Sequence, residues 1–540
     1  MSQPTSPQPW PSGALGPSEI DTRRQRHIRR VERWLLLLAL GTYFFTAGGS
    51  LTTTDAVVTY DVTEGLIERH SVAMSGNLLG LEAERGVDGR YYSPFGIGQS
   101  LYNVPFYLAG RAVANHTDFR TGKSDTIPKA VVALGQTLLC ALIVLQTFRL
   151  SLQMTGGVAA SLMAALTLAF ASILWPYARF GFNQPLACAT LLAAVAHAWH
   201  AARLDSARAA ALAGLWLGAA LLTRHEMILA ALPIAVWLLY APGGHPEGRL
   251  RRLSVFALTL SAGVAAWMTF NASRFGNPFD PGLLRDQTPG VGSSLIAGTL
   301  GLLFSPSSSI LLYTPFVLAG VIGLARLLGR ERSTALLLLS LPVVFLLFYA
   351  TLDNWTGGRS YGSRYLLITL PYLAIGWAAW LAHLAAPART ASFVAIALLG
   401  ITVQLPGVLV DYAKTSQAAA AARGAFTPTE RKWSWEASGL LLNTKALMSA
   451  VPANVRYLTG RAPRPAIAPA SSETDRGFSQ QLSFSLDFWW LYLFYLRALS
   501  ARTVALLGAG ALVWIGVCCR QLLKALRHAT DRPLTAPLRL

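Results

Sequence analysis

Long apolar runs alternate with short polar segments over most of the chain. Runs of about 17–25 apolar residues have the length that crosses the hydrocarbon core of a membrane as a helix. We expect transmembrane helices at residues 34–50, 127–148, 157–175, 185–201, 208–222, 225–241, 254–270, 308–328, 334–351, 363–385, 391–410 and 502–519. The pattern predicts an all-α, polytopic membrane protein with a bundle of about twelve transmembrane helices.

Two further apolar stretches, 100–114 and 486–499, contain aromatic residues and polar breaks. We interpret both as interfacial or re-entrant helices next to the bundle. Counting only one of them as a full span would place the basic C-terminal end outside the cell, against the usual distribution of positive charge.

Basic residues collect in short segments between the apolar runs, at 23–33, 203–208, 249–252, 326–332 and 520–527. Cytoplasmic loops of membrane proteins carry such an excess of Lys and Arg, so we expect both termini in the cytoplasm. The outer segments are then 51–126, 176–184, 223–224, 271–307, 352–362 and 411–501. Because these segments hold nearly all of the unusual polar motifs, we expect the chemistry on the outer face.

Composition agrees with a membrane protein and narrows the classes of partner. The chain is 53% hydrophobic and 13% charged, whereas a soluble domain carries about 25% charged residues. The net charge of +19 is spread over loops, and no soluble segment combines a basic patch with aromatic residues, which argues against nucleic-acid binding. The four cysteines lie in or beside apolar runs without metal-ligand spacing, so the sequence requires no metal or other cofactor.

The same pattern divides the chain into five regions. We expect a disordered basic cytoplasmic tail (1–33), a transmembrane catalytic module (34–410) with its first outer loop at 51–126, an outer loop region with an interfacial helix (411–501), a last transmembrane helix (502–519) and a second basic tail (520–540). Within the outer region, Pro, Ala and Ser dominate the part before residue 481, which indicates a partly ordered loop rather than an autonomous domain.

The first outer loop brings carboxylates to the outer mouth of the bundle. Asp55 follows three threonines at the start of a helix-compatible segment, where an aspartate either caps the helix or serves as a catalytic base. Asp61, Glu64 and Glu68 are spaced three and four residues apart and share one helix face. A solvated helix face is the better interpretation for the two glutamates, and Asp61 is the second candidate base.

Aromatic residues follow in the same loop. Tyr91 and Tyr92 stand in a segment rich in Tyr, Pro and Gly that precedes an apolar helix. One interpretation is an aromatic anchor at the membrane interface. The other is a loop shaped to hold a lipid headgroup.

Charged residues at the ends of later spans form a second group. Arg224, His225 and Glu226 stand between two apolar runs, and charges at membrane depth are costly and usually functional. Arginine also binds phosphate with two hydrogen bonds, although an internal Arg–Glu pair is an alternative. His225 by itself is better explained as a hydrogen-bonded core histidine than as a metal ligand.

The segment 353–365 combines charge, aromatic rings and glycines at the mouth of a span. Arg359 and Arg364 supply fixed positive charge, and the glycines allow close approach of the backbone. Three aromatic residues in this segment have rings that could stack on a sugar: Trp355, Tyr361 and Tyr365.

Taken together, these segments resemble the bacterial membrane glycosyltransferases of the GT-C fold, which include protein O-mannosyltransferases and aminoarabinose transferases acting on lipid A. The resemblance runs over most of residues 34–410 and rests on the order of the motifs. These are Asp55, Tyr-Tyr-Ser-Pro-Phe-Gly at 91–96, Asn-Gln-Pro at 183–185, Thr-Arg at 223–224, Arg-Phe-Gly-Asn-Pro at 274–278, Ser-Pro at 305–306, Tyr-Thr-Pro at 313–315 and Gly-Gly-Arg-Ser-Tyr-Gly-Ser-Arg-Tyr at 357–365.

The resemblance implies a GT-C-like bundle in a bacterial cytoplasmic membrane, a polyprenyl-phosphate-linked sugar as donor, and a glycan, lipid or protein hydroxyl as acceptor. Asp55 takes the role of the base, with Asp61 as the second candidate. Donor-phosphate or lipid ligands would be Arg179, Arg224, Arg359, Arg364 and Tyr92. Sugar or acceptor ligands would be Tyr91, His225, Trp355, Tyr361 and Tyr365.

Two departures from the family pattern stand out. Ser93-Pro-Phe occupies a place where related sequences often carry a basic residue, and Gln184 stands where many have an acid before the proline. A different donor headgroup, a shifted phosphate ligand or loss of activity would each explain them.

Two other classes of function remain open. A transporter or flippase of lipid-linked sugars would need no catalytic acid and would carry broken helices in repeated halves, but no convincing internal repeat is present. A non-catalytic cell-envelope assembly protein would use the outer segment 411–481 to bind partners.

Overall fold

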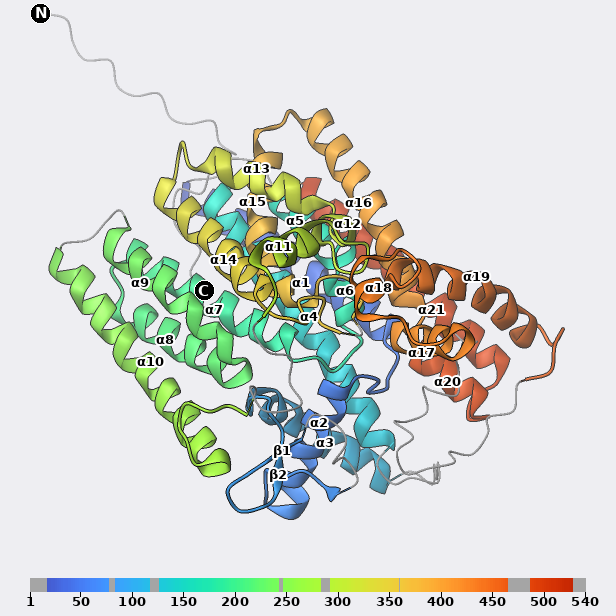
Figure 1. Cartoon of the computed structure of the whole chain (residues 1–540). Helices are drawn as coiled ribbons and strands as arrows, with labels where there is room; N and C mark the ends of the chain where they lie inside the picture. Colours follow the sequence, from blue (N-terminus) through green and yellow to red (C-terminus); the bar gives the residue numbers. More distant parts are fainter. Residues whose placement is uncertain are drawn as a thin grey trace, which may run out of the picture.

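The computed structural model describes residues 17–76, 83–116, 126–241, 246–282, 292–358, 360–464 and 486–527. The described chain is almost entirely helical (Figure 1). The first helix, α1, runs over Pro17–Thr46, so residues 17–33, which we expected to be disordered, are helical. The rest of the predicted disorder, at 1–16, lies outside the described residues.

Helices follow one another along the whole chain. Their bounds are α2 Thr54–Glu64, η1 Gly65–Arg69, α3 Gly98–Asn115, α4 Thr126–Thr155, α5 Val158–Phe170, α6 Leu174–Tyr177, α7 Gln184–Arg203, α8 Ala207–Thr223, η3 His225–Ala230, α9 Ala231–Tyr240, α10 Pro246–Phe275, α11 Leu295–Phe304, α12 Ile310–Tyr313, α13 Phe316–Leu327, α14 Arg332–Ala350, η4 Arg364–Thr369, α15 Leu370–His383, α16 Ala386–Leu409, α17 Tyr412–Arg423, α18 Pro428–Trp433, α19 Gly439–Leu458, α20 Trp489–Tyr495 and α21 Ala501–Arg527.

Seven helices among the described residues are long and apolar enough to cross a membrane: Thr126–Thr155, Gln184–Arg203, Glu247–Phe275, Arg332–Ala350, Arg364–His383, Ala386–Leu409 and Ala501–Arg527. Shorter apolar helices of 10–17 residues accompany them, so the chain is an integral membrane protein, while the number of twelve spans stays a prediction. The span expected at 308–328 is interrupted, because Pro315 separates α12 from α13.

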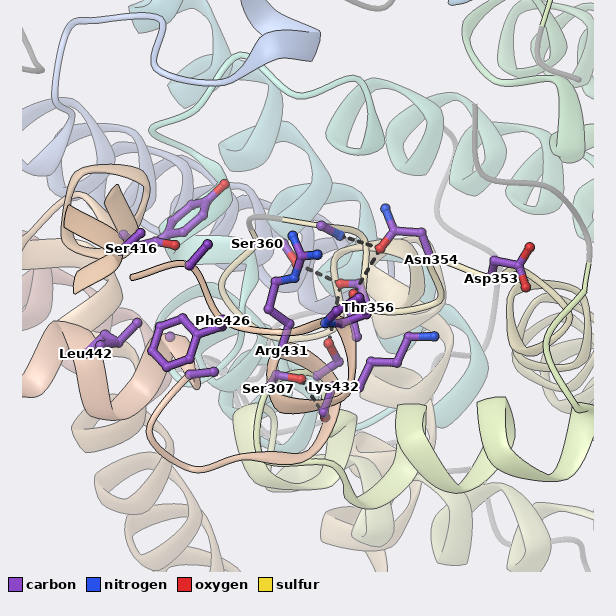
Figure 2. Close-up of a pocket in the computed structure, with 18 residues that line it drawn as sticks. Ser307, Asp353, Asn354, Thr356, Ser360, Ser416, Phe426, Arg431, Lys432 and Leu442 are labelled. Carbon is purple, nitrogen blue, oxygen red and sulfur yellow. Dashed lines mark hydrogen bonds between the residues drawn. The ribbon is translucent and has the colours of Figure 1, made fainter. Parts of the chain in front are cut away.

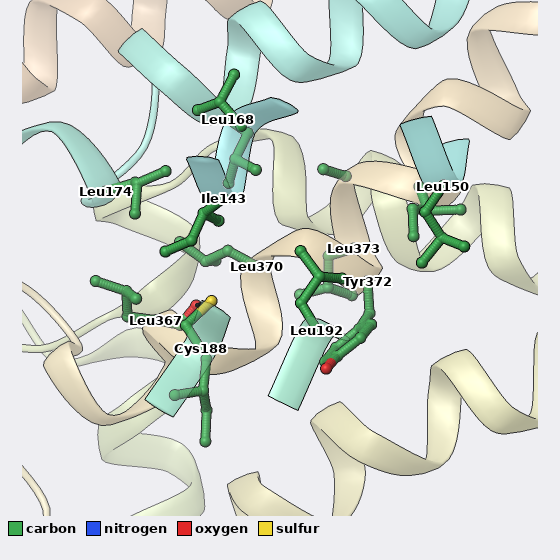
Figure 3. Close-up of a cluster of buried hydrophobic side chains, with 14 of the residues drawn as sticks. Ile143, Leu150, Leu168, Leu174, Cys188, Leu192, Leu367, Leu370, Tyr372 and Leu373 are labelled. Carbon is green, nitrogen blue, oxygen red and sulfur yellow. Dashed lines mark hydrogen bonds between the residues drawn. The ribbon is translucent and has the colours of Figure 1, made fainter. Parts of the chain in front are cut away.

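Helices approach closely where the sequence supplies small residues. In α8, Gly214 and Gly218 are spaced four apart, and a Cβ atom added to Gly218 would lie 3.0 Å from the Cα atom of Gly263 in α10. Such small-residue spacing lets two helix backbones pack against each other in a membrane. The bundle interior is otherwise filled by apolar side chains from α4, α5, α7 and α15, including Ile143, Leu168, Leu192 and Leu373 (Figure 3).

The first outer loop forms a compact layer of its own, with α2, α3 and a two-stranded sheet lying together at the bottom of Figure 1. Strand β1 (Glu84–Arg85) pairs antiparallel with β2 (Tyr91–Tyr92), and the sequence pattern did not predict this sheet. Helix α2 begins after Thr53, whose hydroxyl accepts the backbone N–H of Ala56 at 3.3 Å. Thr53 is therefore the cap, and the carboxylate of Asp55, in the first turn of the helix, is left for another role.

The segment after α16 is helical where it is described. Helix α18 begins with a capping box, in which Thr427 and Glu430 satisfy each other's backbone N–H groups. Helices α17, α18 and α19 lie side by side at the right of Figure 1. Residues of all three helices line one wall of a cavity that is described below.

Candidate functional site

Asp55 pairs with Arg364 at the start of α2. Nη1 of Arg364 donates a hydrogen bond to Oδ2 of Asp55 at 3.1 Å, and both side chains are buried or nearly so. Gly357 makes the approach possible: its φ is +78°, and a Cβ atom there would lie 2.7 Å from Nε of Arg364. A glycine is needed at this position both for the left-handed backbone and for the space. The structure thus brings together the first-loop acid and one of the predicted phosphate-binding arginines.

Two guanidinium groups lie near the ring of Tyr365. Arg364 and Arg224 stand 5.1 Å and 5.5 Å from its centroid, and the ring stacks on Tyr349 at 4.7 Å with an interplanar angle of 8°. Arg364 also lies 4.9 Å from the ring of Phe182. Two positive charges therefore share one aromatic ring, whose faces attract cations, and one of them, Arg364, is paired with Asp55.

Arg224 is fixed by polar partners at the end of α8. Its Nε donates to Oε1 of Glu226 at 2.6 Å, and its Nη1 donates to Oδ1 of Asn183 at 2.8 Å. The hydroxyl of Tyr349 donates to the same Glu226 oxygen at 2.7 Å. The internal Arg–Glu pair that we considered is therefore present, and it orients a guanidinium beside Tyr365. Sequence reasoning considered Glu226 as the partner of Arg224 but did not select Tyr349 or Asn183, although Asn183 belongs to a quoted motif.

His225 is hydrogen-bonded on both ring nitrogens. Nδ1 accepts from Nε1 of Trp267 at 2.7 Å, and Nε2 lies 3.2 Å from the carbonyl oxygen of Pro94. Because Nδ1 accepts, Nε2 carries the proton, and the imidazole is neutral in this arrangement. This agrees with a hydrogen-bonded core histidine, and its role as a sugar ligand stays a prediction.

Arg179 lies apart from the Asp55 pair in its contacts. The buried guanidinium donates to the carbonyl oxygens of Gly407, Val408 and Asp487 and to the carboxylate of Asp487. Lys414 contacts the same carboxylate at 3.3 Å. Arg179 thus joins the end of α16 to the segment before α20, which favours a structural role, and its role as a phosphate ligand stays a prediction.

The remaining first-loop residues stabilise the loop itself. Asp61 accepts from Arg69 at 3.2 Å and from the backbone N–H of Ser75 at 2.9 Å. Tyr92 donates to Asp88 at 2.7 Å, and burial raises the pKa of its hydroxyl above the ordinary value. Tyr91, on the other face of the strand, is exposed. Nothing in these contacts ties Asp61, Tyr91 or Tyr92 directly to Asp55 in the described part of the chain.

The aromatic residues of the 353–365 segment are packed rather than open. Trp355 meets Trp433 edge to face at 5.6 Å, and Tyr361 meets Tyr313 in the same way at 5.0 Å. The Tyr361 hydroxyl donates to the carbonyl oxygen of Val403. Arg359, the other predicted arginine of this segment, lies outside the described residues.

Two buried tyrosines near Asp55 were missed by sequence reasoning. Burial is the largest cause and raises the pKa of both Tyr177 and Tyr412. The charge of Arg364 lowers these pKa values and that of Asp55 raises them. The ring of Tyr412 meets Phe180 edge to face at 5.3 Å. Tyr412 follows a transmembrane run, and no pattern in the sequence connects it to a residue in the first loop.

A cavity of about 500 Å³ opens beside this group (Figure 2). The loop 353–360 and the serines after α11 form one side, and α17, α18 and the start of α19 form the other. Its lining residues are Ser307, Ser308, Asp353, Asn354, Thr356, Gly358, Ser360, Tyr412, Ser416, Ala420, Ala425, Phe426, Pro428, Arg431, Lys432, Ala437, Gly439 and Leu442. Gly358 lines the cavity, and its neighbour Gly357 lies against Arg364, the partner of Asp55.

Among the described residues, no group of three or more His, Cys, Asp or Glu side chains is placed to hold a metal ion. The groups gathered around Asp55 are a carboxylate, guanidinium groups and phenolic hydroxyls in a largely buried site.

No family model matches the chain, and no curated protein matches it. Among solved structures it is similar to ArnT from Cupriavidus metallidurans in the apo state, with a TM-score of 0.50 and 14% identity over 87% of this chain and 84% of that one. The same protein bound to undecaprenyl phosphate matches over the same shares with a TM-score of 0.44. An Archaeoglobus fulgidus oligosaccharyltransferase tethered with an acceptor peptide matches at 12% identity. The match covers 76% of this chain and 58% of that one, with a TM-score of 0.43.

The chain has the GT-C fold. The fold that the sequence resemblance implied is confirmed by the similarity to apo ArnT. At 14% identity the similarity concerns the fold, and function is argued from the site's own residues.

Proposed function

We propose that this GT-C protein is an inverting glycosyltransferase. It moves a sugar from a polyprenyl-phosphate donor to a hydroxyl acceptor on the outer face of the cytoplasmic membrane, with Asp55 as base. One observation carries the proposal: a buried carboxylate at the start of α2 is held by Arg364, with Arg224 on the same aromatic ring. Burying these charges is costly, and their position at the mouth of the bundle favours a chemical role over that of a scaffold.

The residues divide the reaction between them. The acceptor oxygen forms a bond to the anomeric carbon while the bond from that carbon to the donor phosphate breaks, and the acceptor proton passes to the Asp55 carboxylate. The polyprenyl phosphate leaves with the bonding electron pair, so the developing negative charge needs cations more than it needs an acid. Arg224 and Arg364 supply that charge, and the ion pair with Arg364 also orients Asp55.

Direct displacement inverts the anomeric centre, so base and phosphate lie on opposite sides of the sugar. The aromatic and apolar surroundings of Asp55 exclude water, which strengthens the electrostatic contacts and limits hydrolysis of the donor. None of the steps requires a metal ion.

The test is transfer of labelled sugar from a panel of synthetic polyprenyl-phosphate sugars by the purified chain and by Asp55→Asn. A thermal shift measurement confirms that the variant folds. We expect transfer to an acceptor, or hydrolysis of the donor, by the wild type and its loss in the folded variant. Activity that survives in Asp55→Asn would exclude this residue as the base and would direct attention to Asp61. Movement of the donor across a vesicle membrane that is insensitive to Asp55→Asn would support the flippase alternative instead.

A further inference from the structure

The cavity lined by Tyr412 combines polar and apolar groups. Hydroxyl groups come from both of its sides, with Ser307, Thr356 and Ser360 on one and Ser416 on the other. In Figure 2, Ser416, Phe426 and Leu442 lie on one side, Asn354 and Asp353 on the other, and Arg431 between them. Hydroxyl and amide groups match a saccharide, whereas a polyprenyl chain requires an apolar surface.

Charge in the cavity is predominantly positive. Arg431 and Lys432 both line it, against the single carboxylate of Asp353 among its lining residues. The Lys432 ammonium stands 5.8 Å from the ring of Trp355. Two cations that project from the short helix α18 into a cavity of hydroxyl groups favour a ligand that carries an anionic group as well as hydroxyls.

The inner wall of the cavity is Tyr412. Its side chain is buried, and its hydroxyl has no hydrogen-bond partner among the described residues. Buried polar groups normally have a partner, and this hydroxyl, which protein atoms cover, has none among the described residues. Gly358 also lines the cavity, and its neighbour Gly357 lies against the Arg364 side chain, so the cavity wall reaches the Asp55–Arg364 pair.

We propose that this cavity is the acceptor subsite and that it takes an anionic, hydroxyl-bearing saccharide, an inference that rests on the proposed glycosyl transfer. Arg431 and Lys432 hold the anionic group near the opening. The Tyr412 hydroxyl accepts or donates a hydrogen bond at the inner end and directs an acceptor hydroxyl toward Asp55. The outer segment around α17–α19 therefore determines acceptor specificity, while the first loop and η4 carry the transfer.

Binding without a donor tests the subsite separately from the reaction. We would measure saturation-transfer NMR of glucose 6-phosphate and of glucose on the full chain in detergent, and we expect a clear preference for the phosphorylated sugar. Replacing both cations, as Arg431→Gln with Lys432→Gln, should weaken binding about tenfold, as expected for the loss of charge-assisted hydrogen bonds. The matched control is Lys445→Gln with Arg456→Gln, which removes the same charge from α19 outside the cavity.

Filling the cavity gives a second test with its own control. Ala420 lines the cavity and Ala421, its neighbour in α17, does not. Ala420→Trp should abolish binding of glucose 6-phosphate and Ala421→Trp should preserve it, with thermal shift reporting the folding of both. No saturation transfer in the wild type, or equal losses in variant and control, would overturn the proposal.

Tyr412→Phe tests the inner wall. The change removes an unpaired hydroxyl and leaves the ring contact with Phe180, so stability should be unchanged or slightly raised, while affinity for the sugar phosphate should fall about fivefold. Tyr372→Phe removes another buried, unpaired hydroxyl in the bundle core and should leave affinity unchanged. Affinity that is equal in both variants would remove Tyr412 from the subsite. Asp55→Asn should still bind the probe, so failure of the base and failure of the subsite are separate results.

Discussion

Asp55 and Arg364 are 309 residues apart in the sequence, and their side chains form an ion pair at 3.1 Å. The pair joins the first turn of α2 to the first turn of η4, so the first outer loop and the mouth of a late span meet at one point. The two charges of this pair are stabilised by protein groups held in place around them rather than by water. The position of Arg364 depends in turn on Gly357 and on the ring of Tyr365.

Gly357→Ala should lower both stability and sugar transfer. The left-handed φ of +78° costs a non-glycine residue about 1 kcal/mol, and the added methyl group would displace the Arg364 side chain. Gly460→Ala is the matched control, because its φ is +72° and no atom lies within 4 Å of an added Cβ, away from the cavity. Thermal shift and transfer assays on both variants should show similar destabilisation but a larger loss of activity for Gly357→Ala. Equal transfer activities in the two variants would show that the position of Arg364 does not affect catalysis.

Glu226→Ala should destabilise the fold because it leaves the Arg224 guanidinium without its buried carboxylate partner. Breaking a buried ion pair from one side costs about 3–5 kcal/mol. Tyr349→Phe removes only one hydrogen bond to the same oxygen and should cost about 1 kcal/mol. Chemical unfolding in detergent compares the two, and a Glu226→Ala protein as stable as Tyr349→Phe would contradict the importance of the pair.

Arg179 distinguishes a structural role from donor binding. If it holds α16 to the segment before α20, Arg179→Ala should lower the free energy of unfolding by about 3–5 kcal/mol, since Asp487 is left buried with a reduced set of partners. The alternative, a phosphate ligand, predicts a stable protein with a raised KM for the donor. Unfolding and donor-titration measurements on the same preparation decide between them.

Two aspartates outside the membrane-spanning helices should respond to pH in opposite directions. Burial, followed by repulsion from Asp487, raises the pKa of Asp411 above its ordinary value. Its stabilising contribution is therefore complete below the unfolded carboxyl pKa and is lost as pH rises through the folded-state pKa. Asp411→Asn keeps the cap on α17 without the charge. Because the wild type loses stability as Asp411 ionises, the melting temperature of the variant relative to the wild type should rise from acid to neutral pH.

Asp88 is the opposite case. The hydrogen bond from Tyr92, with that from the Arg90 backbone, lowers the pKa of Asp88. Its contribution is present above the unfolded carboxyl pKa and is lost as pH falls through the folded-state pKa. Asp88→Asn should therefore be less stable than the wild type at neutral pH, with the difference disappearing in acid. Melting curves of both variants across this range check the two signs, and parallel curves would contradict both.

Much of the architecture can be predicted from local sequence. Hydropathy over a window of one helix length places α4, α7, α14, α15 and α16 close to the observed bounds of these spans. The reason is that a helix crossing the membrane satisfies its backbone hydrogen bonds within its own segment. The two hydrogen bonds of His225 agree with its interpretation as a core histidine. Local reasoning left open whether Asp55 caps α2, since neighbouring polar residues compete for one cap, and backbone geometry assigns the cap to Thr53.

The sequence by itself determined that this chain is a helical membrane protein with the order of motifs of the GT-C fold and with a carboxylate just after its first span. Only the tertiary structure decided which arginine meets Asp55, that Arg179 is held by Asp487, and that Tyr412 forms the wall of a cavity. The physical reason is that hydropathy reports the burial of each segment one at a time. Ion pairs and cavity walls join side chains from segments hundreds of residues apart, and their partners are chosen by packing of the whole bundle.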